Sequence, residues 1–127
     1  MRTLHGIELN DFTVAYLVCA LWSSMDNDDN PLDLEHDLGD LSKEAVQSAK
    51  DDCDSFLSAN AEIILTETPD EYDNEQAGHD FWLTRNGHGS GFWDRGIGEA
   101  GKKLTDSAHS FGECNLYLGD DNVVYMA

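Results

Sequence analysis

The acidic residues of this 127-residue chain are concentrated in one segment. Residues 26–80 contain 18 aspartates and glutamates but only two basic residues, Lys43 and Lys50, so this segment carries −16 of the formal net charge of −19. A charge this far from zero favours solubility and repels nucleic acids and anionic membranes. Direct binding of DNA or RNA is not expected, because contacts to phosphate need lysine and arginine. Basic surfaces of other proteins are the expected partners.

Three explanations of the acidic segment fit its composition. It can be a solvated polar face, an adaptation to high salt, or an imitation of nucleic-acid phosphates. Salt adaptation fits the excess of 17 Asp over 9 Glu, but it predicts acidic residues spread evenly over the surface. A row of carboxylates near the charge density of B-DNA, about one charge per 1.7 Å, competes for a DNA-binding cleft. The predicted acidic binding surface comprises Asp26, Asp28, Asp29, Asp33, Glu35, Asp37, Asp51, Asp52, Asp54, Asp70, Glu71 and Asp73.

The length and composition predict one acidic domain over residues 1–127, since 40% hydrophobic residues suffice for a modest core. The three cysteines, Cys19, Cys53 and Cys114, are odd in number and lack zinc-ligand spacing. They are predicted to be small buried hydrophobic residues in a reducing compartment. The apolar run Phe12–Trp22 is too short to span a bilayer, and acidic residues before it do not fit a signal peptide. A cytoplasmic location is therefore expected.

Apolar spacing predicts three helices. The first covers residues 12–22, is capped by Asn10 or Asp11, and is apolar nearly all round, which is typical of a buried helix. The second runs from the cap Ser42 to about residue 67. The third covers residues 98–111, with Gly112 as its C-cap residue. Acidic loops at 26–40 and 70–78 flank the second helix.

Two hairpins are predicted as well. Residues 79–84 and 92–94 read as strands around a glycine-rich reversal at 86–91, and residues 115–118 and 123–125 alternate around a turn at 119–122. The expected fold class is therefore α+β, with an antiparallel sheet of about four strands and three helices on one face.

The first predicted hairpin offers a second candidate surface. Each of its two adjacent aromatic pairs places one ring in the core and its neighbour outward, where the outer ring is either covered by another element or exposed beside arginine. An exposed surface of this kind would serve a specific contact, including a homodimer or the assembly of a larger structure. Its candidate residues are Trp82, Arg85, Asn86, His88 and Trp93.

Catalytic and metal-binding motifs are weak. Residues 26–37 resemble a calcium loop, but Pro31 stands where that loop needs glycine. If residues 79–84 are extended, His79 and His88 lie roughly 15 Å or more apart, too far to share a metal. The glycine-rich loop lacks the lysine of a phosphate loop. An enzyme or metal site around Arg85, His88 and Asp94 is the weakest hypothesis, and we expect no cofactor and no catalytic residues.

Part of the chain resembles a known group of proteins. The stretches EQAGHDFWLTRNGHGSGFWDRG and GEAGKKLTDSAHSFGECNLYLGDDNVVY are similar to small acidic proteins encoded by bacteriophages and prophages, over residues 31–125. The specific part is HDFWLTRNGHG followed by GFWD. The group has no assigned activity, so the resemblance assigns no catalytic residue. It implies a phage protein in the host cytoplasm, and it favours an inhibitor or decoy of a host restriction, CRISPR or other DNA-processing complex over an enzyme.

Overall fold

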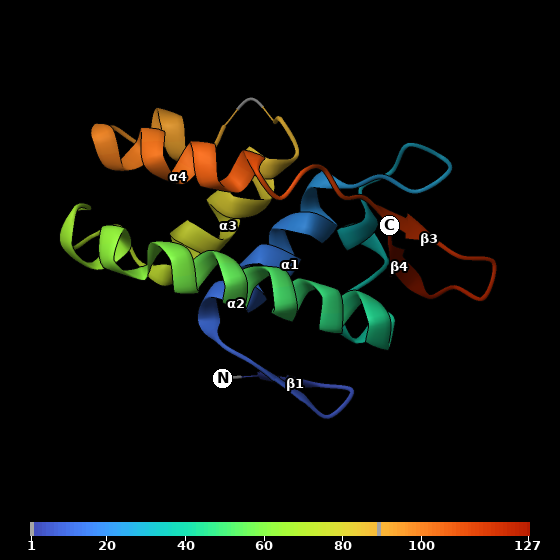
Figure 1. Cartoon of the computed structure of the whole chain (residues 1–127). Helices are drawn as coiled ribbons and strands as arrows, with labels where there is room; N and C mark the ends of the chain where they lie inside the picture. Colours follow the sequence, from blue (N-terminus) through green and yellow to red (C-terminus); the bar gives the residue numbers. More distant parts are fainter. Residues whose placement is uncertain (1, 89) are drawn as a thin grey trace.

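The structure, a computed structural model, describes residues 2–88 and 90–127. These residues form an α+β fold in which four helices pack together and two separate pairs of antiparallel strands lie at the edges (Figure 1). The helices are α1 (Asp11–Ser23), α2 (Lys43–Thr66), α3 (Asn74–Arg85) and α4 (Glu99–His109). The strands are β1 (Arg2–Leu4), β2 (Ile7–Leu9), β3 (Leu116–Leu118) and β4 (Val124–Met126), and the short 3₁₀ helices are η1 (Leu32–Leu34), η2 (Leu38–Asp40) and η3 (Phe92–Asp94).

The three predicted helices are present as α1, α2 and α4, with ends shifted by one or two residues. The starts of α1 and α2 follow from capping side chains, whereas α4 begins after Gly98 without a side-chain cap. Asn10 accepts a hydrogen bond from the backbone N–H of Thr13, and Ser42 accepts one from that of Ala45. The predicted C-cap at Gly112 is wrong, because the C-cap residue of α4 is Ser110, and Gly112 takes the left-handed conformation (φ +74°) two residues later.

The predicted strand at residues 79–84 is wrong, because these residues lie inside α3. The helix begins at Asp73, whose side chain accepts a hydrogen bond from the backbone N–H of Gln76. Its buried positions include Ala77, Phe81 and Thr84, a spacing of four and three residues that suits a helix. The cap and this spacing outweigh the strand preference of the aromatic residues.

The predicted return strand at residues 92–94 is also wrong, because η3 occupies it. The backbone N–H of Phe92 donates to Thr84 Oγ1 at 3.1 Å, and that of Gly91 donates to Asp94 Oδ1 at 3.1 Å. Side chains thus take the donors that a strand would use for pairing. The predicted reversal at 86–91 includes Gly89, which lies outside the described residues.

The sheet structure differs from the single four-stranded sheet expected. The C-terminal hairpin is confirmed as β3–β4, and the backbone N–H of Ser42 donates to Val124 O at 2.8 Å, which ties it to the start of α2. The pair β1–β2 was not predicted. Its turn residues His5 and Gly6 both have positive φ (52° and 78°), as a two-residue hairpin turn requires, but His-Gly is a weaker signal than Asn-Gly.

The core lies between α1, α2 and α3, with α4 beside α3 at one end (Figure 1). Aromatic rings from three of these elements meet there. Phe56 of α2 stacks on Phe81 of α3 with ring centroids 4.2 Å apart, and Tyr16 of α1 lies 5.2 Å from Phe81. The most extensive helix contact is between α1 and α3. At their crossing, a Cβ on Gly78 would come within 2.0 Å of Phe12 O.

The buried cysteines lead to a first prediction. Cys19 and Cys53 are free and buried, and burial raises the pKa of the Cys19 thiol to about 12 and that of Cys53 above its ordinary value. Burial raises the pKa of the Cys114 thiol as well, but Cys114 is only half-buried, so iodoacetamide at pH 8 is expected to modify it first and the other two only after unfolding. Mass spectrometry of timed samples measures the order, and rapid labelling of Cys19 or Cys53 in the folded protein contradicts it.

Candidate functional site

The acidic side chains of residues 26–80 are mostly exposed. Fourteen of the 18 are on the surface, three are half-buried, and Asp80 is fully buried. Of the twelve predicted binding residues, Asp26 and Asp52 are half-buried. The exposed ones are Asp28, Asp29, Asp33, Glu35, Asp37, Asp51, Asp54, Asp70, Glu71 and Asp73.

The two half-buried aspartates, Asp26 and Asp52, make interactions within the protein that stabilise the fold. Asp26 Oδ1 accepts hydrogen bonds from the backbone N–H of Asp28 and Asn30, at 2.8 and 3.0 Å, and so closes the turn after α1. Asp52 Oδ2 lies 2.8 Å from Arg85 Nη1. Substitution of either residue would therefore disturb the structure as well as the surface charge.

The outward carboxylates of α2 are unevenly spaced, because Asp51 and Asp54 are three residues apart, or about 4.5 Å along the helix, while the others are farther apart. Glu44 and Asp51 are seven residues apart, which is about 10 Å along a helix with a rise of ~1.5 Å per residue. One strand of B-DNA carries a charge about every 3.4 Å. On the same helix Lys50 pairs with Asp54 at 2.9 Å. By itself α2 does not present a row of carboxylates at phosphate spacing, so most of the exposed acidic charge lies in the loops before and after it.

The residues of the predicted hairpin do not form one exposed surface. Trp82 and Arg85 are 2% and 5% exposed, and they belong to α3 rather than to a strand. The Trp82 indole N–H donates to Ser23 Oγ at 2.8 Å. Trp93, in η3, is 58% exposed and His88 is exposed, while Asn86 is half-buried and accepts a hydrogen bond from the Cys114 N–H. The assembly hypothesis rested on a hairpin whose two strands are replaced by α3 and η3.

The Arg85 side chain makes its hydrogen bonds inside the protein. Its guanidinium donates to the carbonyl oxygens of Phe111 and Gly112, at 3.1 and 2.8 Å, and to Tyr16 Oη at 3.0 Å. Burial raises the pKa of the Tyr16 hydroxyl far above its ordinary value, so the phenol stays neutral beside the arginine. With Asp52, these contacts connect α1, α2, α3 and the end of α4.

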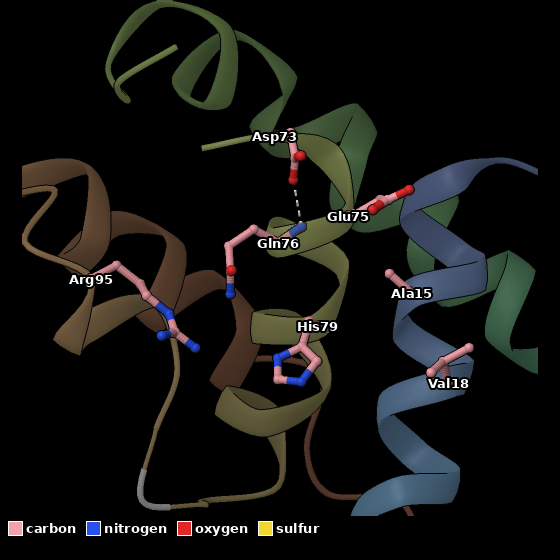
Figure 2. A pocket seen from close by; sticks show the side chains of 7 residues that line it. All are labelled: Ala15, Val18, Asp73, Glu75, Gln76, His79 and Arg95. Atoms are coloured by element: carbon pink, nitrogen blue, oxygen red, sulfur yellow. Dashed lines mark hydrogen bonds between the residues drawn. The ribbon is translucent and has the colours of Figure 1, made fainter. Parts of the chain in front are cut away.

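A pocket with a volume of about 560 Å³ lies between α1, the first turns of α3 and the segment after η3. Figure 2 shows Gln76 and His79 of α3 between two walls, with Ala15 and Val18 of α1 on one side and Arg95 on the other. We call this pocket the α1–α3 groove. It is lined by Ala15, Val18, Asp73, Glu75, Gln76, His79 and Arg95.

One face of α1 is apolar and uncovered. Ala15, Val18 and Trp22 follow each other at helical spacing, and we call them the α1 stripe. Val18 is 49% exposed and Trp22 is 55% exposed. The Trp22 indole lies against the His79 ring, with ring centroids 6.0 Å apart. The prediction that this helix is buried on all sides is wrong for the α1 stripe.

A second hollow, with a volume of about 350 Å³, lies on the other side of Val18. Two exposed carboxylates, Asp33 and Asp37, line it together with Arg2 and the apolar Leu21. The α1–α3 groove also contains two exposed carboxylates, Asp73 and Glu75. Because Val18 lines both hollows, acidic side chains from the two loop regions flank the same face of α1.

The buried carboxylate of Asp80 fixes one wall of the groove. Arg95 donates to both its oxygens, with Nη2 at 2.8 Å from Oδ1 and Nε at 3.0 Å from Oδ2. Tyr72 Oη donates at 2.7 Å and Gln76 Nε2 at 3.1 Å. Hydrogen bonding to Asp80 raises the pKa of Arg95, and burial raises that of Tyr72, so both remain donors to the carboxylate at neutral pH. The Arg95 charge is thereby neutralised by Asp80.

His79 carries a polar atom that has no hydrogen bond among the described residues. Its Nδ1 is buried and lies 3.8 Å from Asp80 Oδ1, beyond hydrogen-bonding distance. The ring is partly exposed and lines the groove beside Trp22. The buried Nδ1 is not accessible from the groove, so His79 contributes the partly exposed surface of its ring.

Sequence reasoning missed the groove because it assigned residues 79–84 to a strand. The available signal was Asp73 three residues before Gln76, followed by apolar residues at helical spacing, which marks a helix start. Nothing in the local sequence places Arg95 against Asp80, because that contact depends on the path of the chain through η3.

Within residues 2–88 and 90–127, no group of three or more His, Cys, Asp or Glu side chains is arranged to hold a metal ion. None of the helices in this part of the chain has the length and apolar character needed to cross a membrane.

Comparison with known proteins found no match. No family model matches the chain, and neither a curated protein nor a solved structure matches it. The function must therefore be argued from the chemistry of the surface.

Proposed function

We propose that this protein is an acidic binding protein that occupies a basic surface on another protein. One observation carries the proposal: 14 carboxylates of residues 26–80 are exposed, in a segment that has only two lysines. Several other basic side chains are already engaged within the protein, because Arg85, Arg95 and Lys103 pair with Asp52, Asp80 and Glu67. The field of such a surface attracts positively charged partners over long range and speeds their association.

The resemblance to small acidic phage proteins suggests which basic surface is meant. A nucleic-acid-binding cleft in a host defence or DNA-processing complex carries the required positive charge, so the protein would act there as a decoy or inhibitor. The uneven spacing of the outward acids on α2 favours competition through total charge over an atom-by-atom copy of phosphates. This proposal predicts that double-stranded DNA displaces the protein from such a cleft.

Binding is expected to weaken with added salt and with loss of exposed carboxylates. A fluorescently labelled oligolysine peptide is a suitable probe, with affinity measured by anisotropy at increasing ionic strength. Neutralising Asp28, Asp29, Asp70 and Glu71, each exposed, as Asp→Asn and Glu→Gln is expected to weaken binding about tenfold, at ~0.4 kcal/mol per exposed charge.

The matched control changes the charge in the opposite direction. Lys43→Gln removes a positive charge from the same segment and is expected to tighten binding of the oligolysine peptide. The proposal is contradicted if affinity is independent of salt and all these variants bind alike, because a charge-driven complex must respond to both.

A further inference from the structure

We propose that the α1 stripe and the two hollows beside it form a docking surface for a basic amphipathic helix of a partner protein. The inference rests on the proposed function and adds the location of the contact and the chemistry of the partner. A partner helix would place an apolar face on Val18 and Trp22 and its lysines or arginines at the flanking carboxylates. Helices commonly dock in this way, with anchors at every third or fourth position.

The apolar part of this surface lies on a helix of the core. Val18 and Trp22 are each about half exposed, although most residues of α1 are buried. Tryptophan is among the residues that contribute most to protein interfaces when it becomes buried there. The Trp22 ring lies beside the groove, with its centroid 6.0 Å from that of the His79 ring.

The charges around the stripe select a basic partner. Asp73 and Glu75 stand in the groove on one side of Val18, and Asp33 and Asp37 stand in the hollow on the other side, together with the exposed Arg2. The four carboxylates outnumber this arginine, so the charge beside the stripe is negative in sum. Arg95, the cation of the groove, is bonded through two nitrogens to the buried Asp80. Its charge is compensated, so the carboxylates set the sign of the potential in the groove.

Charge complementarity also decides between a partner and a second copy of the chain. A symmetric dimer through the α1 stripe would bring the same four carboxylates of each copy towards each other, in chains of net charge −19. Like charges placed opposite each other across an interface oppose association. A basic helix meets the same apolar surface with attraction in place of repulsion.

Three synthetic helical peptides test the inference. The first has a leucine face and a lysine face, the second replaces its leucines with alanine, and the third replaces its lysines with glutamate. The leucine–lysine peptide is expected to bind at least about tenfold more tightly than the alanine–lysine peptide, because only the former has large side chains for the stripe. The glutamate peptide is expected not to bind.

Substitutions on the protein locate the contact. Val18→Ser and Trp22→Ser are each expected to weaken binding of the leucine–lysine peptide about tenfold and to leave that of the alanine–lysine peptide within about twofold. The matched controls, Leu65→Ser and Trp93→Ser, remove equally exposed or more exposed apolar side chains elsewhere (80% and 58% exposed) and are expected to leave binding of both peptides unchanged. Circular dichroism checks that each variant is folded.

The outcomes separate the two proposals. If the alanine–lysine peptide binds in a salt-dependent way and the leucine–lysine peptide binds no more tightly, the docking surface is wrong and the proposed function stands. If no basic peptide binds even at low salt, both fail. Equal losses from Trp22→Ser and Trp93→Ser overturn the location. Sedimentation that shows a dimer dissociated by Trp22→Ser would assign the stripe to a second copy, which also overturns the inference.

Discussion

The substitution Gly78→Ala is expected to lower the free energy of unfolding by about 3 kcal/mol, the upper part of the range for overpacking a core. The added Cβ would lie 2.0 Å from Phe12 O, 2.9 Å from its carbonyl carbon and 3.1 Å from its Cα. All three atoms belong to the backbone of α1, so no side-chain rotation relieves the contact. The two helices must separate, although their interface is the most extensive one between elements of the fold.

A graded control tests this explanation. Gly101→Ala in α4 brings a Cβ within 2.8 Å of Phe92 O, a milder approach than at Gly78. Alanine also favours a helix over glycine by about 1 kcal/mol, so the net change at Gly101 is expected to be small. Urea unfolding of both variants measures the difference. Equal stability of Gly78→Ala and the wild-type protein would show that the α1–α3 crossing is looser than the structure has it.

Much of the helical framework follows from local sequence. Asn10 and Ser42 are capping residues directly before long apolar patterns, and both helices begin where these residues predict. The C-terminal hairpin follows from alternation around a turn. In these segments the local preference and the tertiary packing agree, so the local preference is sufficient.

The failure at residues 79–84 has a physical reason. His79-Asp80-Phe81-Trp82-Leu83-Thr84 contains aromatic residues that favour strands, but every one of these positions lies in α3, and from Asp80 to Thr84 all are buried. A segment buried on several sides has no alternation to distinguish a strand from a helix. Gly78 allows α3 to pack closely on α1, and this long-range contact favours the helix.

The sequence predicted the acidic charge of the candidate site but not the arrangement of its residues. The acidic character of the loops is visible in the sequence, and most of the residues predicted from it are exposed. Which carboxylates flank an apolar surface depends on how the 26–40 loop and the start of α3 lie around α1. The exposure of Trp22 depends on where the other segments of the chain lie, and the periodicity of the sequence does not predict their positions.

The substitution Arg95→Met is expected to lower the free energy of unfolding by about 3 kcal/mol, because it leaves a buried carboxylate without its countercharge. Asp80 is 0% exposed, and Arg95 supplies hydrogen bonds to both of its oxygens. Tyr72 and Gln76 still donate in the variant, which keeps the cost at the lower end for a broken buried ion pair. Methionine retains most of the aliphatic stem, so the lost charge is the main change.

An exposed ion pair of the same length is the matched control. Lys103 Nζ lies 2.9 Å from Glu67 Oε1, compared with 2.8 Å between Arg95 and Asp80, but both partners are largely exposed to water. Lys103→Met is expected to change the stability little, since surface ion pairs contribute little. If both substitutions lowered the free energy of unfolding by similar amounts, the burial of Asp80 would not explain the contribution of its ion pair to stability.

A double-mutant cycle with Asp80→Asn isolates the pair. The single Asp80→Asn change leaves Arg95, whose side chain is 30% exposed and can be hydrated, so it is expected to cost less than Arg95→Met. The double variant is expected to be more stable than the sum of the single losses predicts, by about 1.5 kcal/mol, because each single change leaves an unpaired group that the double change removes. Additive losses would assign Arg95 a packing role instead.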